Sequence, residues 1–435
     1  MYEGAPLIVR VLKKILPEPV VRPLLPLYHR ALAFLSALSY GFPARRLIVM
    51  GVTGTKGKST VAEMLFAILT ASGKKVALAS TIRFAIGEES EPNRFKMTTP
   101  GRGFMQAFMH RALAAGCTHV VVEITSEAVL QYRHQFLALD GLVVTNIQRE
   151  HIERHGSFEK YVAAKRSIVR ALECSTKPTR VLVASRDTPE TNAFLKARVP
   201  RAIGFDAQEL TKLVADDAHV SFEYAQVPIA LPLPGVFNAL NALAAIKLCA
   251  AFGVPVTTAA QALSTLSHIP GRVERIEEGQ DFLVVVDYAH TPDSLSALYS
   301  AFPNRRKICV LGNTGGGRDV WKRPAMGRVA DEACGEVILT NEDPYDEDPR
   351  AIVDAMARGM TRPPQIIMDR REAIRVALAL AQEDDMVLVS GKGTDPFIMG
   401  PHGTKTPWSD AAVTREELTR LRQEKNRRTP DRMPL

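Results

Sequence analysis

The 435-residue sequence lacks the marks of a secreted or membrane-spanning protein. Its five cysteines lie far apart and form no Cys-x-x-Cys pair, as fits a reducing cytoplasm. The start of the chain lacks the basic, apolar and small-residue order of a signal peptide. The longest apolar stretch near the N-terminus, residues 31–38, is too short to span a bilayer. These absences predict a cytoplasmic protein.

Internal repeats, low-complexity tracts and basic segments rich in aromatic residues are also missing, so we expect no nucleic-acid partner. The formal charge of +8 is modest for this length and suits small polyanionic substrates. With 46% apolar and 23% charged residues, the chain has ample material for buried cores. Its length favours about three domains.

The clearest local signal is a glycine loop at residues 51–60, between an apolar run and a helical pattern. A strand, a glycine loop and a helix N-terminus together bind the phosphates of a nucleotide, a lysine adds a point charge, and a hydroxyl can reach Mg²⁺. Val52 stands where the strict Walker spacing has glycine, so the loop is a variant. The residues predicted to bind ATP here are Gly54, Thr55, Gly57, Lys58, Ser59 and Thr60.

Strand and helix patterns alternate along the rest of the chain, which predicts an α/β fold. We expect strands at 47–52, 75–80, 118–124, 141–146 and 180–184, and helices near 60–71, 103–115, 157–172 and 188–197. An antiparallel excursion at 219–233 and a helix at 238–252 follow. After a turn-rich boundary, strands recur at 282–287, 307–311, 336–340, 365–368 and 386–390, with helices near 293–301, 323–334, 349–358 and 370–382.

This pattern predicts a central P-loop ATPase domain with a mostly parallel sheet at 46–269 and a C-terminal Rossmann-like α/β domain at 270–425. A short helical segment at 1–45 precedes them, and a disordered tail is expected at 426–435. Residues 20–42 form an amphipathic pattern. It could pack on the core, which we favour, or make weak peripheral contact with a membrane.

Glu123 ends an apolar run, so it should project from the carboxyl edge of the sheet, where open α/β folds place ligands. A carboxylate beside phosphates is a natural ligand for Mg²⁺. A solvated glutamate at a strand end would explain the local sequence too. In isolation, Lys165 likewise reads as a surface lysine on a helix.

The glycine loop resembles that of the Mur ligase family, the ATP-dependent amino-acid ligases of peptidoglycan precursor synthesis. Further segments resemble, in order, motifs of the branch that adds the third residue of the stem peptide. They are residues 98–100, 123–133, 145–165, 233–241, 270–274, 287–293, 316–324 and 391–393. The resemblance covers roughly residues 46–412.

The resemblance implies that ATP activates a carboxylate as an acyl phosphate, which an amino group then attacks. It implies two Mg²⁺ ions, with Ser59, Glu123, His151 and a carbamylated Lys165 as the metal site. Lys58 and Lys322 would neutralise charge on the migrating phosphoryl group. The nucleotide would also contact Asn238, Asn241, Arg272, Asp287 and His290 from two domains, so that ATP closes one domain on the other.

The substrates implied are an amino acid and a muramoyl-peptide-type precursor. The residues that would bind them are Thr98, Thr99, Ser126, Arg133, Arg318, Glu342, Asp343, Tyr345, Gly391 and Asp395. In the family string Asp-Asn-Pro-Arg, the arginine grips the distal carboxylate of meso-diaminopimelate, whereas this chain has Tyr345. Negative charge from Glu342, Asp343 and Asp395 would favour an ammonium, so we predict lysine or ornithine.

Only about 45 residues precede the first expected strand, so we expect no counterpart of the family's uridine-binding N-terminal domain. We expect a monomer. Three alternatives remain at this stage. One is a sister ligase of the superfamily that extends folate with glutamate or polymerises amino acids as in cyanophycin synthesis. The others are a non-catalytic ATP-binding partner and a membrane-docked scaffold built on a ligase fold, although Lys58, Ser59, Glu123, His151 and Lys165 are all present.

Overall fold

The computed structural model describes residues 18–101 and 103–428, and it divides into two compact units. The first unit runs to Lys212 and adds Phe222–Ile229 and Ala239–Thr265. The second unit holds Leu213–Ser221, Ala230–Asn238 and the chain from Leu266 onward. The predicted boundary at 269–270 falls close to this division.

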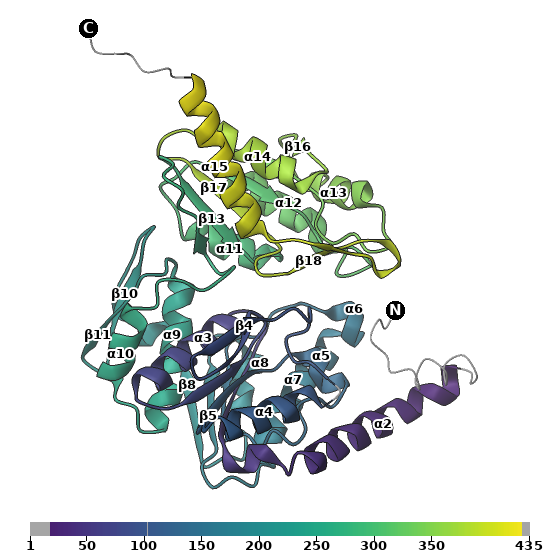
Figure 1. Ribbon diagram of the computed structural model, residues 1–435, viewed down its shortest axis with the longest axis vertical. Helices are drawn as coiled ribbons and strands as arrows, with labels where there is room; N and C mark the ends of the chain where they lie inside the picture. Colours follow the sequence, from purple (N-terminus) through teal and green to yellow (C-terminus); the bar gives the residue numbers. More distant parts are fainter. Residues whose placement is uncertain (1–17, 102, 429–435) are drawn as a thin grey trace. The chain divides into compact units, whose positions relative to one another are not determined.

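The first unit is built on an eight-stranded sheet (Figure 1). Its strands are, in spatial order, β4 (Glu89–Pro92), β3 (Arg83–Ile86), β2 (Val76–Ala79), β5 (His119–Glu123), β1 (Ile48–Thr53), β6 (Gly141–Val144), β7 (Val181–Ser185) and β8 (Arg201–Phe205). Neighbouring strands from β2 to β8 pair in parallel, and β3 and β4 form an antiparallel hairpin at one edge. The mostly parallel sheet predicted from the sequence is therefore confirmed.

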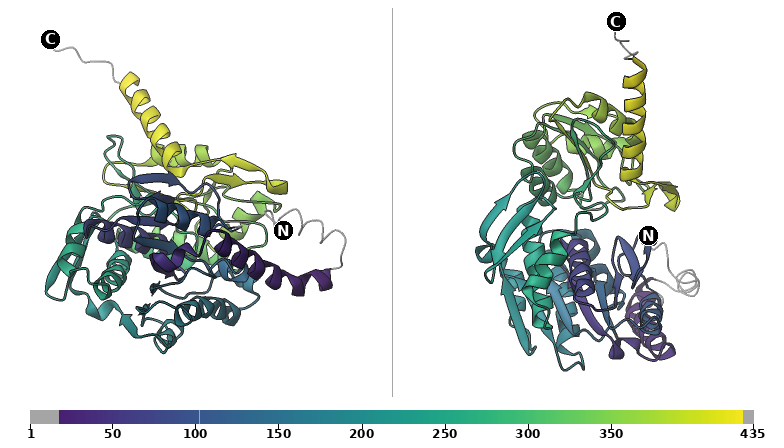
Figure 2. Two further views of the ribbon diagram at one scale, coloured as in Figure 1. Left: turned by 60° about the horizontal axis from the view of Figure 1, so that its bottom comes forward. Right: turned by 60° about the vertical axis from the view of Figure 1, so that its left-hand side comes forward.

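Helices cover both faces of this sheet (Figures 1 and 2). One face packs with α4 (Phe104–Ala114), α7 (Phe158–Glu173) and α8 (Pro189–Phe194) in a single core. On the other face lie α3 (Lys58–Ala71), α9 (Val236–Ala251) and α10 (Val256–Ser264). The shorter elements are η1 (Pro43–Arg46), α5 (Ser126–Leu130), α6 (Ile152–His155) and η2 (Ala207–Glu209). The long helix α2 (Glu18–Ser39) precedes them all.

The segment predicted to leave the main sheet, residues 219–233 with Val220 and Phe222, lies in a small separate sheet. It is a three-stranded sheet of β11 (Val227–Leu231), β10 (Val220–Tyr224) and β9 (Thr211–Ala215).

The second unit is a six-stranded sheet between two helical layers. Its strands are, in spatial order, β12 (Glu274–Arg275), β13 (Leu283–Asp287), β17 (Met386–Ser390), β14 (Lys307–Leu311), β15 (Glu336–Leu339) and β16 (Gln365–Ile366), with only β12 antiparallel. Its helices are α11 (Pro292–Ser300), α12 (Lys322–Ala333), α13 (Pro349–Ala357), α14 (Arg370–Leu380) and α15 (Asp410–Arg428). A hairpin of β18 (Phe397–Met399) and β19 (Lys405–Pro407), with η3 (Pro401–Gly403) between them, joins the last strand of the sheet to α15.

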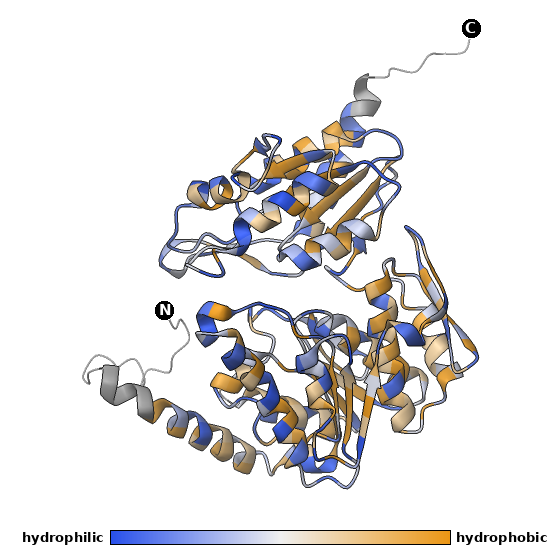
Figure 3. Ribbon diagram, turned by 180° about the vertical axis from the view of Figure 1, so that it is seen from behind, coloured by the Kyte–Doolittle hydropathy of each residue, from blue (hydrophilic) through white to orange (hydrophobic). Residues whose placement is uncertain are grey.

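Alternate residues of these strands enter different cores, as the two-residue period of a strand requires. Val285 and Leu388 pack against α11, α12 and α13, whereas Val286 and Val387 pack against α14 and α15. Because both faces are covered, the strands read as continuous apolar runs, which Figure 3 shows in orange.

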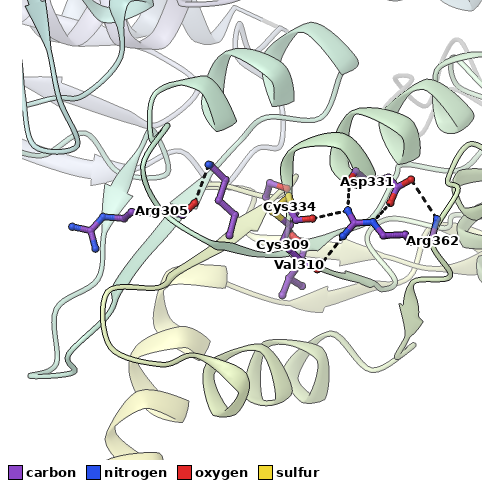
Figure 4. The surroundings of a disulfide bond; sticks show 9 residues. Arg305, Cys309, Val310, Asp331, Cys334 and Arg362 are labelled. Atoms are coloured by element: carbon purple, nitrogen blue, oxygen red, sulfur yellow. Dashed lines mark hydrogen bonds and ion pairs between the residues drawn. A yellow bond between two sulfur atoms is a disulfide. The ribbon is translucent and has the colours of Figure 1, made fainter.

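A disulfide joins Cys309 on β14 to Cys334 at the end of α12, with their Cα atoms 6.2 Å apart (Figure 4). Both residues are buried in the core that β14 shares with α12. Arg362 donates a hydrogen bond to the carbonyl of Cys334 at 2.8 Å and pairs with Asp331. This disulfide was not expected from the sequence, where the wide spacing of the cysteines suggested a reducing compartment, because the two cysteines are 25 residues apart and meet only when the helix folds back on the strand.

Among the described helices, none combines the length and the apolar character needed to cross a membrane. Helix α15 continues to Arg428, into the segment for which a disordered tail was predicted. The rest of that predicted tail, 429–435, and the first part of the predicted N-terminal segment, 1–17, lie outside the described residues.

Candidate active site

The glycine loop lies where β1 ends and α3 begins, and two of its glycines have no room for a side chain. Gly54 has a φ of 146°, and a Cβ there would lie 1.9 Å from Thr145 Oγ1. Gly57 is the N-cap of α3 with a φ of 78°, and a Cβ there would lie 2.3 Å from Asn241 Oδ1. A backbone this close to its neighbours, ending at a helix N-terminus, forms the cradle that nucleotide phosphates need.

Side chains from other elements fix the shape of the loop. Thr55 Oγ1 lies 2.7 Å from the hydroxyl of Tyr161 on α7. Lys58 Nζ donates to the carbonyl of Thr55 at 2.9 Å, and Ser59 and Thr60 are buried in the first turn of α3. The shape of the loop is therefore supported by Tyr161 of α7 and by Lys58 of α3.

Glu123 is the centre of a hydrogen-bonded cluster at the carboxyl edge of the sheet. Its Oε2 accepts from Ser59 Oγ at 3.0 Å, from the backbone N–H of Thr81 at 2.8 Å and from Thr81 Oγ1 at 2.9 Å. The Thr81 hydroxyl also contacts Thr98 Oγ1 at 2.7 Å, and Thr99 Oγ1 donates to the carbonyl of Glu123 at 2.9 Å. The cluster thus joins the glycine loop to Thr98 and Thr99, two of the residues predicted to bind substrate.

Lys165 is fully buried on α7, which rules out the surface lysine that its local sequence suggests. Its Nζ donates to the carbonyl of Gly54 at 2.7 Å and lies 4.9 Å from the centre of the Tyr161 ring. Burial lowers the pKa of Lys165 well below its usual range, and the nearby Lys58 ammonium lowers it further. The structure therefore places Lys165 at the glycine loop, where its protonated form is disfavoured.

His151 is the N-cap of α6 and adopts a left-handed backbone, with φ 57° and ψ 28°. Its ring nitrogens lie 3.9 Å from Glu127 Oε1 and 4.0 Å from Glu150 Oε2. Glu150 is buried and pairs with Lys56 of the glycine loop at 2.9 Å. Charged groups of opposite sign thus link the loop to the segment that carries His151.

Of the predicted acceptor residues, Ser126 begins the short helix α5 and Arg133 follows it. Arg133 donates to the carbonyl of Thr99 at 2.8 Å and also contacts Gln131. Ser126 Oγ lies 3.1 Å from the ring Nε2 of the buried His155. Arg133 therefore reaches the loop that carries Thr98 and Thr99, next to the Glu123 cluster.

The residues predicted to contact the rest of the nucleotide fall in both units. Asn241, in the first unit, faces Gly57 of the loop. Asn238 donates from its side-chain amide to the carbonyl of Pro234 at 2.8 Å, in the first turn of α9. Its side-chain amide therefore helps to fix this turn.

Asp287 in the second unit accepts from the backbone N–H of Val273 at 2.8 Å and of Ala289 at 2.6 Å. His290 Nδ1 lies 2.7 Å from the carbonyl of Tyr288, and Arg272 stacks over the Tyr288 ring at 4.4 Å. Arg272, Asp287 and His290 thus share one loop cluster. Their expected meeting with the glycine-loop nucleotide stays a prediction.

The predicted amino-acid pocket is a buried cluster of charges in the second unit. Lys392 Nζ lies 2.8 Å from Asp343 Oδ1 and 3.2 Å from Asp395 Oδ2. Although burial opposes it, the two carboxylates raise the pKa of Lys392 above its usual value. Lys392 therefore offsets part of the negative charge that Glu342, Asp343 and Asp395 were expected to give the pocket.

Glu342 is buried beside this cluster. Its Oε1 accepts from Thr314 at 2.9 Å, whereas its Oε2 has no hydrogen-bond partner among the described residues. Burial raises the pKa of Glu342, and Asp343 raises it further. Gly391 packs against it so closely that a Cβ there would lie 2.3 Å from Glu342 Oε2.

Tyr345 has a left-handed backbone, and the Arg318 guanidinium lies over its ring at 4.8 Å. Lys322 and Arg323 are buried at the start of α12. Arg323 forms a bidentate pair with Glu347 at 2.6 and 2.9 Å. Arg323 thereby fixes a loop next to Tyr345.

The structure thus assembles the sequence-predicted residues into three clusters, one around Glu123, one around Asp287 and one around Lys392. Thr81 and Lys392 were missed as members. Thr81 lies just after β2, and Glu123 ends the neighbouring β5, so the position of Thr81 at a strand end was a usable signal. Lys392 lies within the quoted Gly391–Gly393 string, but nothing in the sequence links it to Asp343.

No three acidic, histidine or cysteine side chains gather into a ready metal site anywhere in the described chain. Ser59 and Glu123 nevertheless offer two adjoining oxygen ligands beside the phosphate cradle. That donor set fits Mg²⁺, which keeps several waters and binds through one or two protein oxygens together with substrate phosphates.

Comparison with known proteins identifies the family. The model of the Mur ligase middle domain matches residues 52–249, and that of the Mur ligase glutamate ligase domain matches residues 271–393. A UDP-N-acetylmuramyl-tripeptide synthetase of Roseiflexus sp. (strain RS-1) is 35% identical over 93% of this chain and 84% of its own length.

Two further proteins are similar. The UDP-N-acetylmuramoyl-L-alanyl-D-glutamate–2,6-diaminopimelate ligase of Geobacillus thermodenitrificans (strain NG80-2) is 34% identical over 87% of this chain and 80% of its own length. A solved structure of a ligase with the same description has a TM-score of 0.58 and 27% identity, covering 86% of this chain and 79% of that one.

Proposed function

Since this chain belongs to the Mur ligase family of ATP-dependent ligases, we propose that it joins an amino acid to the carboxylate of a muramoyl-peptide-type precursor. The observation that carries this proposal is the Glu123 cluster. Through Thr81, it connects Ser59 of the glycine loop to Thr98. One group of hydrogen bonds therefore links the proposed phosphate site to the proposed acceptor site.

In the proposed reaction, an acceptor carboxylate oxygen attacks the γ-phosphorus of ATP, and ADP leaves. The amino group of the second substrate then attacks the acyl carbon of the acyl phosphate, loses a proton and expels phosphate. The protein forms no covalent bond. Lys58 and Lys322 would stabilise negative charge on the phosphoryl group, and Arg133 would hold the acceptor.

We propose Ser59 and Glu123 as ligands of one Mg²⁺ ion, and His151 with a carbamylated Lys165 as ligands of a second. Bound Mg²⁺ would neutralise phosphate charge during transfer. A carbamate forms when an unprotonated amine adds to CO₂ and loses a proton, which converts a cation into an oxygen-donor anion. The burial of Lys165 at the carbonyl of Gly54 supports this role, because it disfavours the ammonium form.

Replacing Lys165 tests the proposal against a matched control. Lys247 is also buried, also donates to a backbone carbonyl, that of Gly204 at 2.8 Å, and lies in the same unit. Lys165→Ala should abolish amino-acid-dependent phosphate release while the far-UV spectrum is retained, and short-chain carboxylic acids should partly restore activity. Lys247→Ala should keep its activity, with no response to added acids. Full activity of Lys165→Ala would refute the metal-site assignment.

For the added amino acid, we propose lysine or ornithine rather than the 2,6-diaminopimelate in the names of the relatives. At the place of the expected arginine stands Tyr345, and the Glu342 carboxylate has a buried oxygen without a partner. An ammonium at the end of the substrate side chain would supply that partner. The distal carboxylate of meso-diaminopimelate would find less compensation, although Arg318 lies beside Tyr345.

Comparing kcat/KM for lysine, ornithine and meso-diaminopimelate decides the amino acid. Tyr345→Arg should move the preference toward meso-diaminopimelate, and Glu342→Gln should raise KM for lysine more than it lowers kcat. A preference of the unchanged protein for meso-diaminopimelate would refute the charge argument.

We also propose that the protein works as a monomer in the cytoplasm, where ATP is available.

A further inference from the structure

Helix α2 carries a row of apolar side chains that face solvent. Leu24, Leu27, Leu35 and Leu38 follow one another at intervals of three, eight and three residues, which places them on one side of the helix. Their exposed fractions are 51% for Leu24, 62% for Leu27, 57% for Leu35 and 53% for Leu38. We refer to these four leucines as the outer face of α2. An isolated exposed leucine is ordinary, but a continuous row on one helix indicates a binding surface.

The C-terminal part of α2 is held against the first unit. Ala37 is fully buried, and the rings of Phe34 and Phe136 meet edge to face at 5.8 Å. The Tyr40 ring lies 5.6 Å from the His110 ring of α4. Figures 1 and 2 show the N-terminal part of α2 extending beyond the helices that cover the sheet. The outer face is thus presented by a helix whose orientation in this unit is fixed.

The charge around the outer face is of one sign. The sequence has no aspartate or glutamate between Pro19 and Ala62, a stretch that contains all of the outer face. Arg30 on α2 and Arg45 and Arg46 on η1 are exposed. Arg30 lies over the Tyr132 ring and Arg45 over the Phe42 ring, which fixes both guanidinium groups close to α2.

From this combination we propose that α2 docks the protein on the surface of an anionic lipid bilayer. Its leucines would enter the boundary between headgroups and acyl chains, and its arginines would meet lipid phosphates. A second copy of the chain fits less well, because two such faces would bring like charges together. Since no described helix can cross a membrane, α2 would lie on the bilayer rather than span it.

The docking would also affect the acceptor site, and this consequence rests on the proposed function. Arg30 and Phe34 of α2 contact Tyr132 and Phe136, which lie close to Arg133 in the chain. The loop with the predicted acceptor arginine would therefore lie close to the bilayer, within reach of an acceptor held at a lipid surface.

Vesicle co-sedimentation of the full chain tests the docking without using activity. The protein should sediment with vesicles of phosphatidylcholine mixed with phosphatidylglycerol, and at least about tenfold less with phosphatidylcholine alone or at high salt. Leu27→Glu/Leu35→Glu should reduce binding by about tenfold or more. Arg45→Glu/Arg46→Glu should reduce binding to anionic vesicles by a similar factor.

Matched controls come from the second unit. Val214 is as exposed as Leu35, at 57%, so Val214→Glu introduces the same charge elsewhere. Arg350→Glu/Arg420→Glu reverses two exposed arginines far from α2 in the sequence. Neither control should change vesicle binding.

Three outcomes would overturn the proposal. One is equal sedimentation of the Leu27→Glu/Leu35→Glu variant and the unchanged protein. Another is the absence of binding to anionic vesicles. The third is a dimer, detected by light scattering, that this variant converts to monomer, which would assign the outer face to a second copy. Loss of ligation with intact vesicle binding would count against the proposed function alone.

Discussion

Replacing Gly57 by alanine should damage the glycine loop far more than the same change at Gly73. Both residues have a φ of 78°, and they lie at the two ends of α3. Alanine in this left-handed backbone conformation is disfavoured by about 1 kcal/mol at either position. At Gly73 nothing lies within 4 Å of the new Cβ, whereas at Gly57 it would lie 2.3 Å from Asn241 Oδ1. Crowding of this kind adds about 1–3 kcal/mol.

The expected loss of unfolding free energy is therefore about 1 kcal/mol for Gly73→Ala and about 2–4 kcal/mol for Gly57→Ala. Urea denaturation of both variants measures this difference. Because the loop or the Asn241 side chain must shift to admit the methyl group, ADP affinity of Gly57→Ala should fall by at least about tenfold. Gly73→Ala should bind ADP like the unchanged protein.

A double-mutant cycle isolates the cause. In an Asn241→Ala background the crowding is gone, so Gly57→Ala should then cost about as much as Gly73→Ala, about 1 kcal/mol. If Gly57→Ala costs the same with and without the Asn241 side chain, and retains ADP binding, the close approach of α9 to the loop does not constrain the loop.

Three further predictions concern other parts of the molecule. Thr81→Val removes one of the donors to Glu123 and should raise the Mg²⁺ concentration needed for ADP binding, whereas Thr81→Ser should not. Equal Mg²⁺ dependence of the two variants would contradict the role of the Thr81 hydroxyl in positioning Glu123. The Cys309–Cys334 disulfide closes a 25-residue loop, so a reductant should lower the unfolding free energy by about 3 to 4 kcal/mol, and an unchanged melting temperature would show that the bond does not form. Burial lowers the pKa of His134 from 6.5 to about 4, so its contribution to stability is present above pH 6.5 and is lost as the pH falls toward 4. His134→Phe should flatten this pH dependence by about 3 kcal/mol, measured by urea denaturation at several pH values.

The sequence predicted the strands that are apolar on both faces, whereas the elements it missed include β3, α10 and the fully exposed β4. The central strands of both sheets are runs such as Val120-Val121-Val122, which are covered on both faces and therefore stand out as apolar. Strand β4, Glu89–Pro92, has every residue exposed and contains two glutamates and a proline. Such a strand forms because β3 offers it a hydrogen-bonding edge, and that edge exists only after the sheet has assembled.

The same distinction applies to the site. The phosphate cradle could be predicted because its glycines, lysine and serine are contiguous in the chain. The environment of Glu123 could not be predicted in full, because Thr81 lies 42 residues away and arrives through the pairing of β2 with β5. Likewise, Lys392 meets Asp343 across 49 residues. Charge compensation of this kind depends on the order of the strands, which local sequence does not encode.

The position of Lys392 changes how the second unit could select an amino acid. If Asp343, Asp395 and Glu342 all faced the substrate, selection would rest on their combined charge. With Lys392 placed between the two aspartates, Glu342 is the carboxylate of the three for which no ion pair is seen in the described part of the chain. Burial raises the pKa of Glu342 and so disfavours its charged form, and a substrate ammonium beside it would stabilise that charge. Discrimination would then depend on one carboxylate and on the length of the side chain that reaches it, rather than on a diffuse acidic lining.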